Sequence, residues 1–143
     1  MADTFNRDTL RADLRRDEGC VLSVYTDSEG YYTIGVGRLV DHRRGGGLTY
    51  DEVMDLLDND IDACVADVEN EPWYQACDTD ARRRAILNMR FELGRDGIRE
   101  FKTSLGLIAA KQWGAAADHL EQSLWASQVP ARAARVIGMI RNG

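Results

Sequence analysis

One short segment alternates apolar and polar residues, and it limits the possible folds more than any other feature of the chain. Residues 20–37 (CVLSVYTDSEGYYTIGVG) contain two alternating runs, 20–27 and 31–37, on either side of the turn signal Asp-Ser-Glu-Gly. Two such runs around a turn predict a β-hairpin. Apolar residues elsewhere follow helical spacing, so the sequence predicts an α+β protein, mostly α, with its strands near the N-terminus.

A first helix is expected just before the hairpin. Asn6 is a favourable N-cap, and Phe5 and Leu10 occupy the two positions of a hydrophobic staple. Gly19 fits the position that follows the end of a helix. These signals place the helix between residues 6 and 19.

A long helix is expected after the hairpin. Residues 41–47 (DHRRGGG) are interpreted as a flexible connector and a boundary between a small N-terminal lobe and the rest. Thr49 and Glu52 then form a capping box. Apolar residues recur three and four positions apart as far as Val68, which predicts a helix of about 20 residues that could connect two lobes.

The C-terminal half consists of further helical segments. Gly94 is expected to end the helix that begins after Asp78, and Pro130 fits the first turn of the final helix. Thr103 or Ser104 is a candidate N-cap for a helix between them. No strand signal returns after the hairpin.

Composition excludes several classes of protein. The 143 residues suit one domain, and 44% of them are apolar, which is enough for a core. The net charge of −6 is unlike that of a nucleic-acid-binding protein, so no nucleic-acid partner is expected. No apolar run approaches the ~18 residues of a membrane span, which predicts no membrane insertion. The polar N-terminus lacks a signal-peptide core, so we expect synthesis in a cytoplasm.

Cysteine and histidine spacing gives no metal or disulfide signal. Cys20, Cys64 and Cys77 are odd in number and include no CxxC pair. His42 and His119 lie far apart in the sequence. We therefore expect neither a metal nor any other cofactor.

Two carboxylates around the hairpin are candidates for acid–base chemistry. Glu18 ends the first helix, where the helix dipole and the neighbouring Asp17 both favour a protonated carboxyl. Asp27 lies at the hairpin turn, where nearby backbone N–H groups should keep it ionised. Such a pair is typical of a general acid and its partner. Carboxylates nine residues apart are also common as solvated surface groups, so the residues alone leave both interpretations open.

A hydroxyl group and two glycines follow these carboxylates. If Ile34 and Val36 face the core, Thr33 faces outward over a surface that Gly35 and Gly37 leave free of side chains. A hydroxyl near an ionised Asp could hold a water molecule. An acid, a carboxylate and a positioned water are the groups needed to hydrolyse a glycosidic bond.

The same residues resemble a known family. The segment "DEG…YTDSEGYYTIGVGRL" is similar to the active-site region of phage-type lysozymes, glycoside hydrolase family 24, of the T-even type. The resemblance continues in "ARRRAILNMRFELG", "GIREFKTSL", "QWGAAADHL" and "WASQVPARAARVI". It implies a lysozyme-like fold with a small lobe (about 15–48), a connecting helix (about 49–70) and a helical lobe (about 71–143 plus the N-terminal helix).

The resemblance also implies an activity. It is that of an endolysin or muramidase, which hydrolyses the β-1,4 bond between N-acetylmuramic acid and N-acetylglucosamine in peptidoglycan. Glu18 would be the general acid, and Asp27 with Thr33 would position the attacking water, with inversion. The implied substrate contacts are Leu39, Phe91, Ser104 and His119. Arg132 matches the family arginine that approaches the catalytic glutamate across the cleft and supports the catalytic site. Such a cation would lower the pKa of Glu18, against the effects of the helix dipole and Asp17.

Some positions depart from the family pattern. His119 replaces an asparagine, and Arg38 stands where a histidine is expected after "TIGxG". The segment between Leu39 and Thr49 is shorter by about 20 residues than in the T-even type, which predicts a trimmed small lobe.

Several alternatives stay open beside the muramidase. The first is a catalytically silent peptidoglycan-binding module on the same fold, since fold does not determine function. A lytic transglycosylase and an acidic helical interaction protein are weaker ones. For the muramidase we expect a monomer that is made in a host cytoplasm and acts on the cell wall after release.

Overall fold

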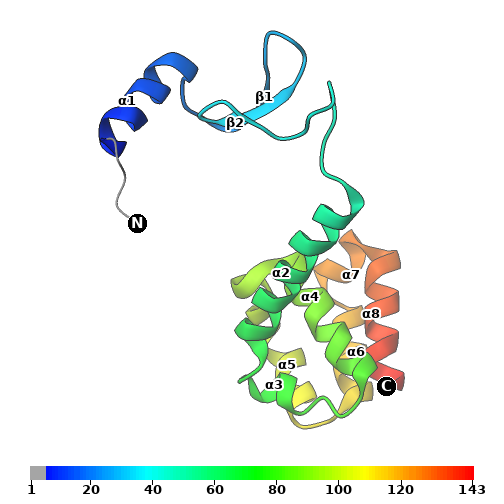
Figure 1. Ribbon diagram of the computed structural model, residues 1–143. Helices are drawn as coiled ribbons and strands as arrows, with labels where there is room; N and C mark the ends of the chain where they lie inside the picture. The colour runs from blue at the N-terminus through cyan, green and yellow to red at the C-terminus, as the bar shows by residue number, and fades with distance from the viewer. Residues whose placement is uncertain (1–5) are drawn as a thin grey trace. The chain divides into compact units, whose positions relative to one another are not determined.

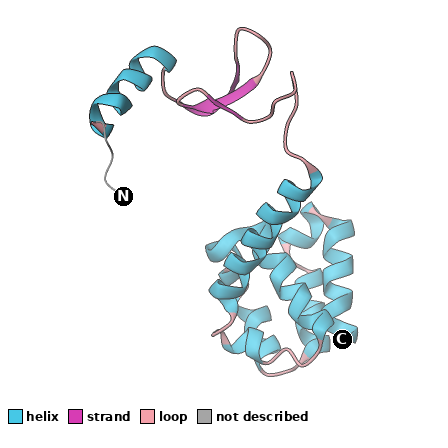
Figure 2. Ribbon diagram, viewed as in Figure 1, coloured by secondary structure: helices cyan, strands magenta, loops and turns pink. Residues whose placement is uncertain are grey.

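A computed structural model describes residues 6–143 of the chain. The chain divides into two compact units, residues 1–54 (unit 1) and residues 55–143 (unit 2). Unit 1 contains the strands, and unit 2 is helical (Figures 1 and 2). The α+β, mostly α class predicted from the sequence is confirmed. The grouping of the N-terminal helix with the helical lobe stays a prediction.

Helix α1 (Arg7–Glu18) begins and ends where its signals predicted. The Asn6 side chain accepts a hydrogen bond of 3.0 Å from the Thr9 N–H, so the predicted N-cap is confirmed. Gly19 has φ +80° and donates its N–H to the Arg15 carbonyl, which closes the C-terminal end. Phe5, a partner in the predicted staple, lies outside the described residues.

The three strands form one antiparallel sheet in the order β1-β2-β3. Strands β1 (Val21–Thr26) and β2 (Tyr32–Gly35) form the predicted hairpin, and β3 (Arg38–Leu39) extends it. Thr33 lies on the middle strand, opposite Tyr25 on one side and Leu39 on the other.

The predicted outward orientation of Thr33 is wrong. The residue is only 3% exposed, whereas Val36 is 39% exposed. Simple alternation fails because the pairing of β1 with β2 is irregular between Val21 and Tyr25, and because β2 ends at Gly35. Gly35 and Gly37 both have φ +66°, so they form the turn into β3 and do not clear the surface of a continuing strand.

The connector 41–47 contains more local structure than its glycines suggested. The Asp41 carboxylate accepts hydrogen bonds from the backbone and guanidinium of Arg43 and from the Gly47 N–H. These bonds hold the pKa of Asp41 well below its usual range, chiefly through the Arg43 side chain. The connector thus folds around one carboxylate.

Helix α2 (Tyr50–Val68) confirms the predicted capping box. The Thr49 N–H donates to the Glu52 carboxylate at 2.7 Å, and the Glu52 N–H donates to the Thr49 hydroxyl at 3.2 Å. The boundary between the two units falls within this helix.

Six further helices make up the rest of unit 2. They are α3 (Pro72–Gln75), α4 (Asp80–Arg99), α5 (Lys102–Ala109), α6 (Trp113–Glu121), α7 (Leu124–Gln128) and α8 (Pro130–Asn142). Pro130 opens α8 as predicted. Gly94 has φ +79° and ψ 176°, so it breaks α4 as its sequence position indicated. None of the helices within residues 6–143 is long and apolar enough to cross a membrane.

The core of unit 2 gathers side chains from all of these helices. Trp73 and Trp125 lie in it, and Trp125 meets Phe101 edge to face. The prediction that Thr103 or Ser104 caps α5 is wrong, because the helix begins at Lys102 without a side-chain cap. Ser104 lies inside the helix and is 1% exposed.

Candidate active site

In unit 1, Glu18 lies against the turn between β2 and β3. The Glu18 carboxylate is so near Gly37 that a Cβ atom on this glycine would lie 2.7 Å from Oε2. Gly37 therefore has two roles. It adopts the positive φ that the turn requires, and it leaves space for the carboxylate.

The substitution Gly37→Ala tests this second role. The left-handed backbone should cost about 1–2 kcal/mol of stability, and the new methyl group should displace Glu18. If Glu18 is the general acid that the resemblance implies, a displacement of this kind should cost on the order of 10²-fold in activity. Activity on cell walls and thermal unfolding are the measurements.

Gly35→Ala is the matched control, because Gly35 has the same φ of +66° and open space around a Cβ atom. It should lose similar stability and much less activity. Equal losses of activity in the two variants would contradict a role of Gly37 in seating Glu18.

Asp27 is held by the backbone of the hairpin turn. Its Oδ1 atom accepts hydrogen bonds of 2.9 Å from the N–H groups of both Glu29 and Tyr31. The bond from Tyr31 is the main reason that the pKa of Asp27 lies below its usual value, and the Arg44 charge adds to it. Asp27 is therefore an anion at neutral pH, in agreement with the expectation from its place in the turn.

Thr33 and Leu39 are neighbours on paired strands. The Thr33 hydroxyl donates to the Tyr31 carbonyl at 3.3 Å, which leaves the oxygen of Thr33 able to accept a hydrogen bond. Leu39 is 42% exposed. Asp27, Thr33 and Leu39 thus all belong to the one small sheet and its turn.

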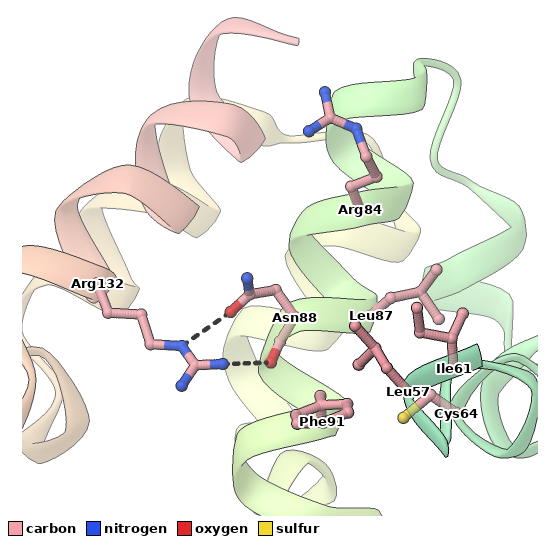
Figure 3. Close-up of a pocket in the computed structure, with 8 residues that line it drawn as sticks. All are labelled: Leu57, Ile61, Cys64, Arg84, Leu87, Asn88, Phe91 and Arg132. Atoms are coloured by element: carbon pink, nitrogen blue, oxygen red, sulfur yellow. Dashed lines mark hydrogen bonds between the residues drawn. The ribbon is translucent and has the colours of Figure 1, made fainter. Parts of the chain in front are cut away.

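In unit 2, Arg132 and Phe91 line one hollow of about 340 Å³ (Figure 3). The Arg132 Nε atom lies 2.9 Å from Asn88 Oδ1 and 3.0 Å from Glu92 Oε2. The sequence analysis did not predict Asn88 or Glu92 as partners of Arg132. Their spacing of four residues, which places both on one face of α4, was the only signal available.

Ser104 and His119 form a hydrogen-bonded pair in unit 2. The Ser104 Oγ and His119 Nδ1 atoms are 2.8 Å apart, and both residues line a second hollow of about 330 Å³. Ser104 is buried, whereas His119 is exposed. The buried hydroxyl therefore fixes the orientation of an exposed imidazole.

The predicted site residues thus form two groups. Glu18, Asp27, Thr33 and Leu39 belong to unit 1, and Phe91, Ser104, His119 and Arg132 belong to unit 2. The approach of Arg132 to Glu18 that the resemblance implied stays a prediction.

The chain belongs to the phage lysozyme family. The model of that family, described as phage lysozyme, matches residues 15–141, a range that contains every predicted site residue. It covers the sheet of unit 1 and the helices of unit 2. The fold that the sequence motifs suggested is therefore that of this family, and the description of the family as phage lysozyme agrees with the suggested activity class.

Individual relatives agree with this assignment. The chain is 33% identical to "Probable T4-type lysozyme 1" of Dictyostelium discoideum, over 91% of this chain and 92% of the relative. It is 30% identical to "Probable T4-type lysozyme 2" of the same organism, over 94% and 95%. It is also 32% identical to the "Pre-baseplate central spike protein Gp5" of Enterobacteria phage T4, over 91% of this chain but 27% of that protein.

The alignments also bear on the predicted shortening. They extend over 157 and 162 positions with the two Dictyostelium proteins, more than the 143 residues of this chain. These relatives therefore have residues that this chain lacks. The place of the shortening, between Leu39 and Thr49, stays a prediction.

Proposed function

We propose that this protein is a glycoside hydrolase, an N-acetylmuramidase that hydrolyses the β-1,4 bond between N-acetylmuramic acid and N-acetylglucosamine in bacterial peptidoglycan. The observation that carries the proposal is the hairpin turn, in which two backbone N–H groups donate to the Asp27 carboxylate and keep it ionised. In the same unit, Glu18 projects from a helix end onto the turn between β2 and β3. Membership of the phage lysozyme family supports the substrate class.

In the proposed mechanism the two carboxyl groups have different roles. Glu18 donates a proton to the glycosidic oxygen as the bond to the sugar breaks. The Asp27 anion orients a water molecule and accepts its proton as the water attacks the anomeric carbon from the opposite face, which inverts the configuration. The Thr33 hydroxyl donates its hydrogen bond to the Tyr31 backbone carbonyl, and its oxygen accepts a hydrogen bond from that water.

The remaining predicted residues are proposed to bind the substrate or to support the catalytic site. Leu39 and Phe91 offer half-exposed apolar side chains to the sugar rings. The Ser104–His119 pair offers an imidazole whose other ring nitrogen points in a fixed direction and can form a hydrogen bond with the sugar. Arg132 is proposed to support the catalytic site, and its orientation is set by Asn88 and Glu92.

The proposed biological role is that of an endolysin, which acts alone on the wall after release from the cell that makes it. Two relatives are named as lysozymes and match the chain along most of their length, which supports an independent enzyme. The match to part of a phage spike protein shows that the same kind of domain also occurs within a larger protein.

A cell-wall assay tests the proposal. The purified protein is expected to clear a suspension of bacterial walls and to release fragments with reducing ends, identified by mass spectrometry. Anhydro sugars would indicate a transglycosylase. Co-sedimentation with the walls without any cleavage would indicate a catalytically silent binding module, and either result would refute the muramidase.

Salt should raise the activity. The chain carries a net charge of −6, and the wall polymer is anionic, so the two repel each other at long range. Because salt screens this repulsion, clearing is expected to become faster between low salt and ~0.1 M. Flat or falling rates across this range would show that net charge does not limit the encounter.

A further inference from the structure

Three arginines of helix α4 converge on one carboxylate of helix α2. The Asp67 side chain is 8% exposed and forms ion pairs with Arg90, with Arg95 at 3.4 Å and with Arg99 at 3.1 Å. Arg99 also donates to the Asp67 backbone carbonyl at 2.9 Å and so satisfies a carbonyl in the last turn of α2. Neither the catalytic groups nor the proposed substrate contacts include any of these residues.

The arginines lie on both sides of the break in α4. Arg90 precedes Gly94, whereas Arg95 and Arg99 follow it. A glycine with non-helical angles interrupts the hydrogen bonds that would join the two parts of the helix. The part after the break, 95–99, is little more than one turn and cannot maintain its own direction. Asp67 connects it to the part before the break.

The segment after the break leads into the Ser104–His119 hollow. Glu100, Phe101 and Lys102 follow directly and line that hollow. Phe101 also packs against Trp125, at a ring-centroid distance of 6.0 Å. The direction of residues 95–99 therefore determines where one wall of the hollow lies.

We propose that Asp67 is a positioning residue: it holds the two parts of α4 at a fixed angle across Gly94 and thereby shapes the substrate-binding hollow of Ser104 and His119. Burial alone would raise the pKa of Asp67, but hydrogen bonds from Arg90 and Arg99 outweigh burial and lower it, so the carboxylate is charged at neutral pH. Arg99 gains a second anchor from Glu71 at 3.2 Å. The part of this proposal that concerns substrate rests on the proposed function.

Hydrogen exchange on the full-length protein tests the structural part without any substrate. In Asp67→Asn, the amides of 95–101 are expected to exchange on the order of tenfold faster, and those of 83–93 much less so. Arg95→Gln, at a side chain that is 73% exposed, is a second variant that leaves the core intact and should give a smaller change in the same amides. Asp67→Glu retains the charge and should restore most of the protection.

Asp80→Asn is the matched control, because it breaks an exposed ion pair with Arg84 on the same helix. It should leave the exchange of 95–101 unchanged. Unchanged exchange in Asp67→Asn and Arg95→Gln, or a uniform increase across unit 2, would overturn the proposal.

Kinetics on soluble peptidoglycan fragments test the functional part. Asp67→Asn is expected to raise KM by about threefold to tenfold with kcat nearly unchanged, because it alters a binding wall and no reacting group. Faster local exchange with an unchanged KM would refute the link to substrate. If the wild-type protein cleaves no peptidoglycan, the proposed function fails, while the exchange data still decide whether Asp67 holds the break in α4.

Discussion

Glu18→Gln should lower the rate of wall clearing by about 10²–10⁴-fold, the usual contribution of a general acid. Glutamine retains the shape of the side chain and its fit beside Gly37 but has no acidic proton to donate to the leaving oxygen. Glu18 is exposed, so the melting temperature should change little. Turbidity of a wall suspension and thermal unfolding are the two measurements.

Glu29→Gln is the matched control for this experiment, because Glu29 is an exposed carboxylate at the hairpin turn. It should retain nearly full activity. If Glu18→Gln clears walls as fast as the wild type, or if both variants lose activity equally, Glu18 is not the general acid.

Asp27→Asn separates the charge of Asp27 from its structural role. The asparagine oxygen can still accept the N–H groups of Glu29 and Tyr31, so the turn should persist while the negative charge is lost. Because the pKa of Asp27 is lowered by folding, its contribution to stability is complete above its ordinary value and is lost only as pH falls through the lowered one. At neutral pH we therefore expect Asp27→Asn to lose activity in the wall-clearing assay while its circular dichroism spectrum stays that of the folded protein.

Features that depend on neighbouring residues could be predicted from the sequence. The caps at Asn6 and Thr49, the turn at Asp27 and the break at Gly94 each involve residues within four positions of one another. The carboxylates were recognisable for the same reason, because a helix end and a hairpin turn are local features. The family motif then added roles that geometry alone left open.

Features that depend on residues far apart in the sequence could not be predicted. Ser104 suits an N-cap by composition, but it pairs with His119 fifteen positions away. Arg132 meets Asn88 forty-four positions away. The strand β3 has only two residues, too few to show alternation, and the burial of Thr33 follows from irregular pairing that no local pattern reveals.

Arg82→Ala should cause a large loss of stability. The guanidinium of Arg82 donates to the carbonyls of Ile140 at 2.9 Å and Arg141 at 3.3 Å, at the end of α8. It also pairs with Asp78 and lies 4.2 Å from the ring centroid of Trp113. Its side chain is 11% exposed, so one residue connects the start of α4 with the end of α8 and the start of α6.

Removal of this side chain leaves the last carbonyls of α8 without their donor and exposes a face of Trp113. Charge-assisted hydrogen bonds and a cation–π contact together suggest a loss of about 2–4 kcal/mol, or a drop of about 10 °C in melting temperature for a chain of this size. Arg82→Lys should recover less than half of the lost stability, because an ammonium group cannot bridge the two carbonyls and stack on the Trp113 ring at the same time.

Arg83→Ala supplies the comparison for this prediction, since the Arg83 side chain is adjacent in sequence and exposed. It should change stability by less than ~0.5 kcal/mol. Calorimetry of the three variants measures the difference. Equal melting temperatures for Arg82→Ala and Arg83→Ala would mean that the end of α8 is held by its core residues alone, among them Ile137 and Ile140.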